Sequence, residues 1–279
     1  MTMRDKFWVW GYTQQKLGMP VPFTGNVKSY CSLETALEYL GIPNAFFLNP
    51  MHSFEQTQHP IVQPEEEIIF GLERLSSQKQ IISALPHGEV ALPAAQKIAD
   101  LSLKFPNIKG VVLDDFLQLS GHPTTPEKVC QLRETLLSVN PNLEIHVVIY
   151  SDLNHLDITP YLEFIDSIVL WRWVSTEHFW KSEFSPLVHR FKENYGKKLF
   201  HGLYIQNYGE YGSNEHPIDL DLWKLQWTQV LKSLRAAPFC GLDGCVLLQN
   251  GWLSDPNFRD HVVWLKQTID WFLGTTTER

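Results

Sequence analysis

Two adjacent carboxylates follow a short apolar segment. Residues 110–116 read Gly-Val-Val-Leu-Asp-Asp-Phe, so a β-branched run ends at Asp114 and Asp115. Buried strands of parallel sheets have this near-continuous apolar composition, and the chemistry of α/β folds takes place just past the carboxyl ends of such strands. Because two acids are costly to desolvate, we expect this pair to serve a function in a cleft. The alternative is an Asp that caps the next helix.

Glycoside hydrolysis is the reaction that such carboxyl groups suggest, since it needs two of them on opposite sides of the scissile bond. Neighbouring residues of a regular strand point to opposite faces, so we expect either Asp114 or Asp115 to enter the site. The second catalytic acid would come from another strand, with Glu177 as the first candidate and Asp152 as the other. Glu177 could instead stabilise the first turn of a helix, and Asp152 could belong to a turn.

Aromatic and amide side chains follow the other predicted strands. The chain has 10 tryptophans, whose flat rings can stack on the apolar face of a sugar. Neutral hydrogen-bonding groups beside aromatic rings suit an uncharged polyhydroxylated ligand, whereas a phosphorylated ligand would require more Arg, Lys or Gly-rich backbone. Arg172 could equally form an ordinary structural pair, and His87 could be an ordinary loop residue. The expected substrate-binding residues are Trp10, Tyr12, His87, Tyr150, Asp152, Trp171, Arg172, Trp173, Tyr204, Gln206, Gln249 and Trp252.

These residues must be positioned by strands, and eight apolar segments of strand length alternate with longer amphipathic segments. The predicted strands are 7–12, 45–48, 80–85, 110–113, 144–150, 167–171, 199–205 and 244–249. The predicted helical segments are 32–40, 64–76, 92–105, 125–139, 161–165, 175–195, 217–236 and 254–272. This alternation predicts a single-domain (β/α)8 TIM barrel over residues 1–279. The alternative is an open doubly wound sheet, although no Gly-rich phosphate fingerprint follows the first strand.

Four tryptophans lie at helical spacing in the last two long helical segments. This spacing predicts that they pack in the core. They are Trp223, Trp227, Trp264 and Trp271.

Composition limits the partners and the location. A net charge of −8 argues against nucleic-acid binding, and no apolar stretch approaches the roughly 18 residues of a membrane span. Cys31, Cys130, Cys240 and Cys245 are scattered, so we expect reduced thiols in a cytoplasmic protein. We expect no cofactor and no metal, because neither His-x-His after the first strand nor His-Glu-x-x-His occurs. The sequence leaves the oligomeric state open.

The segment Asp114-Asp115-Phe116 resembles a pattern in several glycoside-hydrolase-like barrels, where a hydrophobic strand ends in an acidic triplet of this kind. The Asp-x-x-Asp-x-Asp-x-Glu signature of chitinase-like enzymes is absent, since Leu117 and Gln118 follow. The resemblance covers one strand and the overall alternation of strands and helices. It implies a sugar-active enzyme without identifying the catalytic pair. We therefore predict a glycoside hydrolase of a small-molecule or oligosaccharide substrate. A non-catalytic sugar-binding barrel and a metal-dependent hydrolase or isomerase are the alternatives.

Overall fold

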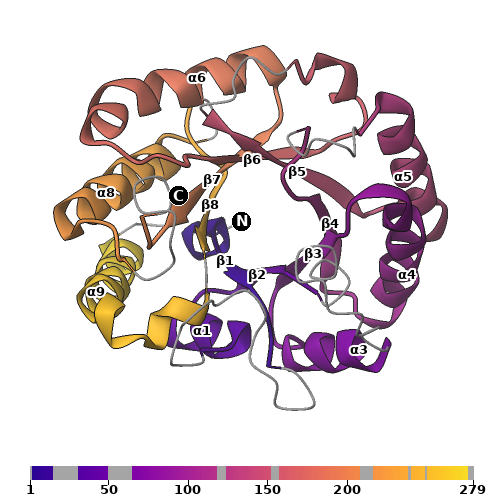
Figure 1. Ribbon diagram of the computed structural model, residues 1–279, viewed down its shortest axis with the longest axis horizontal. Coiled ribbons are helices and arrows are strands. Elements are labelled where there is room, and N and C mark those ends of the chain that lie inside the picture. Colours follow the sequence, from indigo (N-terminus) through magenta and orange to yellow (C-terminus); the bar gives the residue numbers. More distant parts are fainter. Residues whose placement is uncertain are drawn as a thin grey trace.

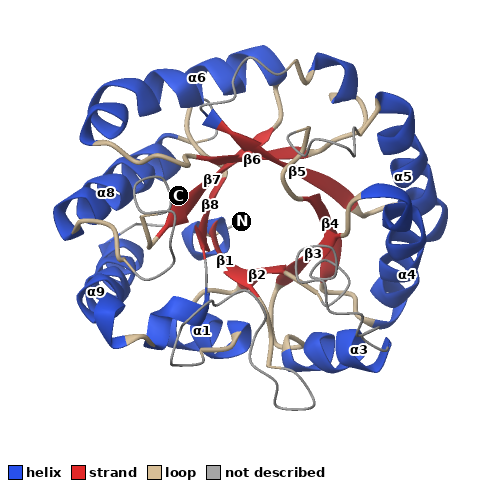
Figure 2. Cartoon of the chain, viewed as in Figure 1, coloured by secondary structure: helices blue, strands red, loops and turns tan. Residues whose placement is uncertain are grey.

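Eight parallel strands form a closed barrel in which neighbours along the chain are neighbours in the sheet (Figures 1 and 2). The ring closes through parallel pairing of β1 with β8. The computed structural model describes residues 2–14, 31–49, 65–117, 124–151, 157–207, 216–237, 240–248 and 250–275. The strands are β1 (Phe7–Gly11), β2 (Asn44–Phe47), β3 (Gln80–Leu85), β4 (Ile108–Leu113), β5 (Glu144–Tyr150), β6 (Ser167–Trp171), β7 (Lys198–Tyr204) and β8 (Gly244–Leu248). The predicted (β/α)8 barrel is confirmed.

Helices surround the barrel, as Figure 2 shows, and the predicted boundaries are correct to within a few residues for most of them. Thr125 and Pro126 begin one helix as expected, since the Thr125 hydroxyl accepts a hydrogen bond from the Lys128 amide at 3.4 Å. After β5, a 3₁₀ turn (Thr159–Tyr161) replaces the helix that we expected. The helices are α1 (Leu33–Leu40), α3 (Glu65–Arg74), α4 (Ala91–Lys104), α5 (Pro126–Val139), α6 (Phe184–Tyr195), α8 (Leu220–Ala236) and α9 (Arg259–Thr275).

Aromatic rings fill the interior of the barrel. Trp8 lies 5.1 Å from Phe46 and 5.7 Å from Phe200 between ring centroids, and all three are buried. Rings of this size leave no room for side chains on some neighbouring strands. A Cβ at Gly202 would lie 2.1 Å from the indole of Trp171, so this position of β7 requires glycine. The interior is therefore a packed core and not a pore.

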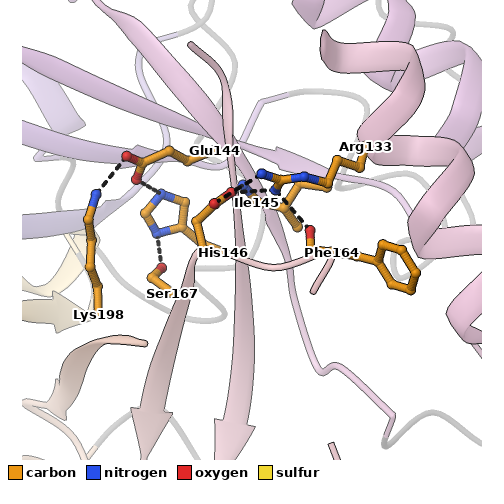
Figure 3. Close-up of polar contacts among 8 residues, drawn as sticks. Arg133, Glu144, Ile145, His146, Phe164, Ser167 and Lys198 are labelled. Atoms are coloured by element: carbon orange, nitrogen blue, oxygen red, sulfur yellow. Dashed lines mark hydrogen bonds and ion pairs between the residues drawn. The ribbon is translucent and has the colours of Figure 1, made fainter. Parts of the chain in front are cut away.

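A polar network closes the amino-terminal end of the barrel around a buried histidine (Figure 3). His146 on β5 bonds through Nδ1 to the hydroxyl of Ser167 on β6, and its Nε2 lies 3.5 Å from Glu144. Glu144 in turn pairs with Lys198 on β7 at 2.6 Å. Burial lowers the pKa of His146 to about 3. The network therefore joins three strands around a neutral imidazole.

A second set of contacts in Figure 3 ties α5 to the same end of the barrel. Arg133 pairs with Asp166 at 2.8 Å and donates a hydrogen bond to the carbonyl of Phe164 at 3.1 Å. The Asp166 carboxylate also accepts a hydrogen bond from the amide of Ile145 at 2.8 Å. These charge-assisted bonds fix the junction between α5 and β5.

The prediction that all four tryptophans of the last two long helical segments pack in the core, between the barrel and the helices, is partly wrong. Trp223 and Trp227 are fully buried, and Trp264 packs partly buried against the core. Trp271 is instead 59% exposed. The neighbouring Phe272 occupies the core-facing position of α9 and packs edge-on against Phe7 at 6.0 Å, which leaves Trp271 on the solvent side.

The four cysteines are all unbridged. Within the described residues, no helix is both long enough and apolar enough to cross a membrane.

Candidate active site

The two carboxylates lie in a tight turn immediately past β4, at the carboxyl end of the barrel. Asp115 has φ +44° and Leu117 has φ +65°, which is the left-handed region that residues other than glycine rarely adopt. The amide of Phe116 donates to the carbonyl of Val148 on β5 at 3.1 Å and anchors the turn. Strained backbone of this kind persists where surrounding structure enforces it and is concentrated at functional sites.

Tyr150, the last residue of β5, fixes the Asp115 carboxylate. Its hydroxyl donates to Oδ1 of Asp115 at 2.9 Å, and the hydroxyl of Tyr204 on β7 lies 3.5 Å from that of Tyr150. Burial holds the pKa of Tyr150 well above its ordinary value, and Tyr204, Asp115 and Asp114 raise it further. Tyr150 therefore stays protonated and donates its hydroxyl hydrogen to the Asp115 carboxyl group.

Aromatic rings at the ends of β5, β6 and β7, and just past β6, pack together around this hydrogen bond. Trp173 stands edge-on to both Tyr150 and Tyr204, with 6.1 Å between ring centroids in each case. Trp171 lies 4.9 Å from Tyr204 and is 2% exposed, whereas Trp173 is 42% exposed. We call Tyr150, Trp171, Trp173 and Tyr204 the aromatic wall. Trp173 is its most exposed member.

A cavity of about 680 Å³ adjoins the carboxylates on the side of α4 and α5. Both Asp114 and Asp115 line it, although the alternation of a regular strand predicts that they diverge. The turn past β4 explains the difference, because the left-handed φ of Asp115 ends the alternation. His87 also lines this cavity, as do the unpredicted residues Val90, Leu92, Leu117 and Lys128. No periodic signal in the sequence marks those four as lining one space.

Several of the residues that we predicted to bind substrate are buried in this structure. Trp10 and Tyr12 are buried at 3% and 5% exposure, and Trp10 packs edge-on against Trp171 at 5.9 Å. Trp10 therefore supports the aromatic wall, and Tyr12 belongs to the same cluster of buried side chains. Gln206, two residues past Tyr204, is 1% exposed, and its amide has no hydrogen-bond partner among the residues that the structure describes. At this exposure the Gln206 side chain presents no surface to a ligand in the present structure.

Other predicted residues are not brought to the Tyr150–Asp115 pair. Glu177 is exposed at 67% and forms an ion pair with Lys181, one helical turn away. The guanidinium of Arg172 lies over the ring of Phe179 at 4.5 Å. Trp252 is fully buried, and its ring lies 6.2 Å from that of Phe258. Asp152 and Gln249 lie outside the described residues.

Asn250, which follows β8, has a structural role at the mouth. Its Oδ1 accepts from the amide of Tyr12 at 3.0 Å, and its Nδ2 donates to the carbonyls of Tyr12 at 3.1 Å and Cys31 at 2.5 Å. A Cβ at Gly11 would lie 1.5 Å from that Oδ1. Gly11 and Asn250 therefore fit together beside the β1–β8 pairing that closes the barrel, which we call the barrel seam.

Ser167, His146 and Glu144 resemble a serine–histidine–acid arrangement, but they lie at the opposite end of the barrel. Ser167 and His146 are 0% and 2% exposed, and neither lines the cavity beside Asp115. A histidine whose pKa is about 3 is a poor general base near neutral pH. Among the described residues, no group of three or more His, Cys, Asp or Glu side chains is placed so that it could hold a metal ion.

The comparisons with known proteins point to the same fold. No family model and no curated protein matches the sequence, whereas solved structures do match. A β-galactosidase from Marinomonas ef1 superposes with TM-score 0.58 at 7% identity, over 96% of this chain and 61% of that one. A GH128 (subgroup I) endo-β-1,3-glucanase from Amycolatopsis mediterranei, in complex with laminaritriose, gives 0.56 at 9% identity, over 95% and 99%.

A third similar structure has a different activity. The xylanase and α-amylase inhibitor protein XAIP-II from Scadoxus multiflorus gives TM-score 0.54 at 11% identity, over 93% of this chain and 98% of that one. At such identities the likeness is one of fold. The chain therefore shares the barrel fold of these glycosidases and of this inhibitor protein.

Proposed function

We propose that this protein is a glycoside hydrolase whose reaction takes place at Asp115. The observation that carries the proposal is the 2.9 Å hydrogen bond from Tyr150 to Asp115, at the carboxyl end of the barrel and beside a cavity. A neutral tyrosine donor stabilises the ionised carboxylate and fixes its orientation. Asp115 is thereby prepared to act as the nucleophile or general base of glycosidic cleavage.

The second carboxyl group of the proposal is Asp114. It lines the same cavity as Asp115, whereas the Glu177 carboxylate pairs with Lys181. In this proposal Asp114 gives a proton to the leaving oxygen while Asp115 acts on the anomeric carbon or on a water molecule. Trp173 would stack on a sugar ring. Glu177 is the alternative second acid.

The test is a screen of the wild-type protein against 4-nitrophenyl glycosides, followed by three carboxamide variants. We expect Asp115→Asn and Asp114→Asn to lower kcat by roughly 10²–10⁴-fold while both keep the native fold, because each would lack an acid or base. Glu177→Gln, on an exposed helix turn, should keep near-wild-type kcat. Full activity of Asp115→Asn would refute the proposed role of Asp115. Loss of activity in Glu177→Gln, with full activity in Asp114→Asn, would show that Glu177 and not Asp114 is the second acid.

A non-catalytic sugar-binding barrel is the second candidate. It is favoured by the likeness in fold to xylanase and α-amylase inhibitor proteins, one of which is solved with trehalose. It is also favoured by the position of both carboxylates after one strand. Isothermal titration with laminaritriose and trehalose, together with the glycoside screen, separates the two functions. Saturable binding without turnover of any glycoside would establish the binding protein.

A further inference from the structure

The cavity beside Asp115 differs chemically from the aromatic wall. Among the described residues, every buried one that lines it is apolar, namely Leu85, Pro86, Ala91, Leu113, Phe116 and Leu132. The charged or amide side chains of Glu89, Lys128 and Gln131 are exposed at its rim. No Trp or Tyr is among the described residues that line it. The buried lining therefore favours a nonpolar group, whereas the aromatic wall reaches Asp115 through the hydrogen bond of Tyr150.

The rim of this cavity also exposes apolar side chains. Val90 is 53% exposed and Leu92, in the first turn of α4, is 39% exposed. Two exposed apolar residues next to an apolar space form a patch that a bound nonpolar group would cover. Leu103, 66% exposed on the same helix, does not line the cavity.

Asp115 connects the two regions. Its carboxylate accepts the hydrogen bond from Tyr150 in the aromatic wall, and the same residue lines the cavity. A molecule whose reacting bond lies at Asp115 would therefore place one end against Trp173 and Tyr150 and the other end in the apolar space.

We propose that this cavity binds the aglycone of the substrate, and that the substrate class is a glycoside with a nonpolar aryl or alkyl leaving group. The inference rests on the proposed function. In hydrolysis the bond from the anomeric carbon to the aglycone oxygen breaks. Water supplies hydroxide to that carbon and a proton, relayed through the carboxyl groups, to the leaving oxygen. The aglycone then departs as an alcohol or phenol, which the apolar walls hold by burying its surface.

The test measures binding of a free aglycone, 4-methylumbelliferone, by fluorescence titration in the absence of any sugar. Wild-type protein should bind it saturably. Leu92→Asp places a charge against the apolar wall and should weaken binding at least about tenfold. Leu103→Asp, the same change at a more exposed position of the same helix that does not line the cavity, should bind as wild type. Since both sites are exposed, both variants should fold, which circular dichroism verifies.

Three outcomes overturn the inference: no saturable binding to the wild-type protein, equal weakening in both variants, or unchanged binding by Leu92→Asp. The probe is not a substrate, so its binding is independent of turnover. If binding behaves as expected but no nitrophenyl glycoside is cleaved, the proposed function fails and the cavity remains a site for nonpolar alcohols. If glycosides are cleaved but Leu92→Asp binds the probe as wild type, the aglycone site fails and the hydrolase stands.

Discussion

The hydroxyl of Tyr150 and the carboxylate of Asp115 lie 2.9 Å apart across the ends of two adjacent strands. The tyrosine belongs to regular β5, and the aspartate belongs to a left-handed turn past β4. Because a strand of the barrel supplies the donor, the position of the carboxylate depends on the barrel as well as on its own turn.

Tyr150→Phe removes the donor to Asp115 and leaves the ring in place. A hydrogen bond to a charged group is worth about 1.5–3 kcal/mol, so we expect kcat/KM on the best nitrophenyl glycoside to fall by roughly 10–100-fold. Tyr195→Phe is the control, since its ring packs on Phe191 in α6, and it should match the wild type. Unchanged kinetics in Tyr150→Phe would show that Asp115 needs no such donor.

Trp173→Ala removes the exposed ring of the aromatic wall. We expect KM or the dissociation constant for a sugar ligand to rise about tenfold, since stacking and area burial contribute on the order of 1 kcal/mol or more. The melting temperature should change little because the side chain is 42% exposed. Trp271→Ala, at 59% exposure on α9, is the matched control. Equal binding by both variants would contradict a stacking role.

Two buried histidines make stability depend on pH. Burial lowers the pKa of His146 and of His201 to about 3, whereas the unfolded chain takes up the proton near pH 6.5. The unfolded state therefore gains protons first. Stability is fully present above about pH 6.5 and falls as pH decreases toward 3. Between pH 7 and pH 5 we expect a loss of about 2 kcal/mol per histidine, measured by urea unfolding.

His201→Leu isolates one of these contributions. The His201 ring packs between Trp180 and Phe184, at 5.2 and 5.1 Å, so an apolar side chain suits the site. The variant should lose about 2 kcal/mol less than the wild type between pH 7 and pH 5. His189→Leu, on the exposed face of α6, should follow the wild-type curve. Parallel curves for wild type and His201→Leu would refute this account.

Asn250→Ala should destabilise the barrel seam. The change leaves the amide and carbonyl of Tyr12 and the carbonyl of Cys31 without the side chain that they bond to. Unsatisfied buried groups cost about 1–3 kcal/mol each, so we expect the free energy of unfolding to fall by about 2–4 kcal/mol. Asn257→Ala, at an exposed position within the 3₁₀ turn Pro256–Phe258, is the control. A small effect in Asn250→Ala would mean that other contacts hold the seam.

The sequence by itself determined the barrel and the position of the carboxylates at the end of β4. Strand and helix periodicities are local, and an apolar run followed by Asp114 and Asp115 marks the end of a strand without knowledge of its neighbours. Only the tertiary structure decided which side chains meet. Tyr150 and Asp115 are 35 positions apart, and the left-handed φ of Asp115, which gives both acids one cavity, is enforced by packing.

Exposure was likewise decided by tertiary packing. Trp10, Trp171 and Trp252 are buried while Trp173 is exposed, although all four lie at or near strand ends in the sequence. Composition does not distinguish a ring that fills the barrel from a ring that faces solvent. The difference depends on how far past the last layer of interior side chains each residue lies, which long-range strand register sets.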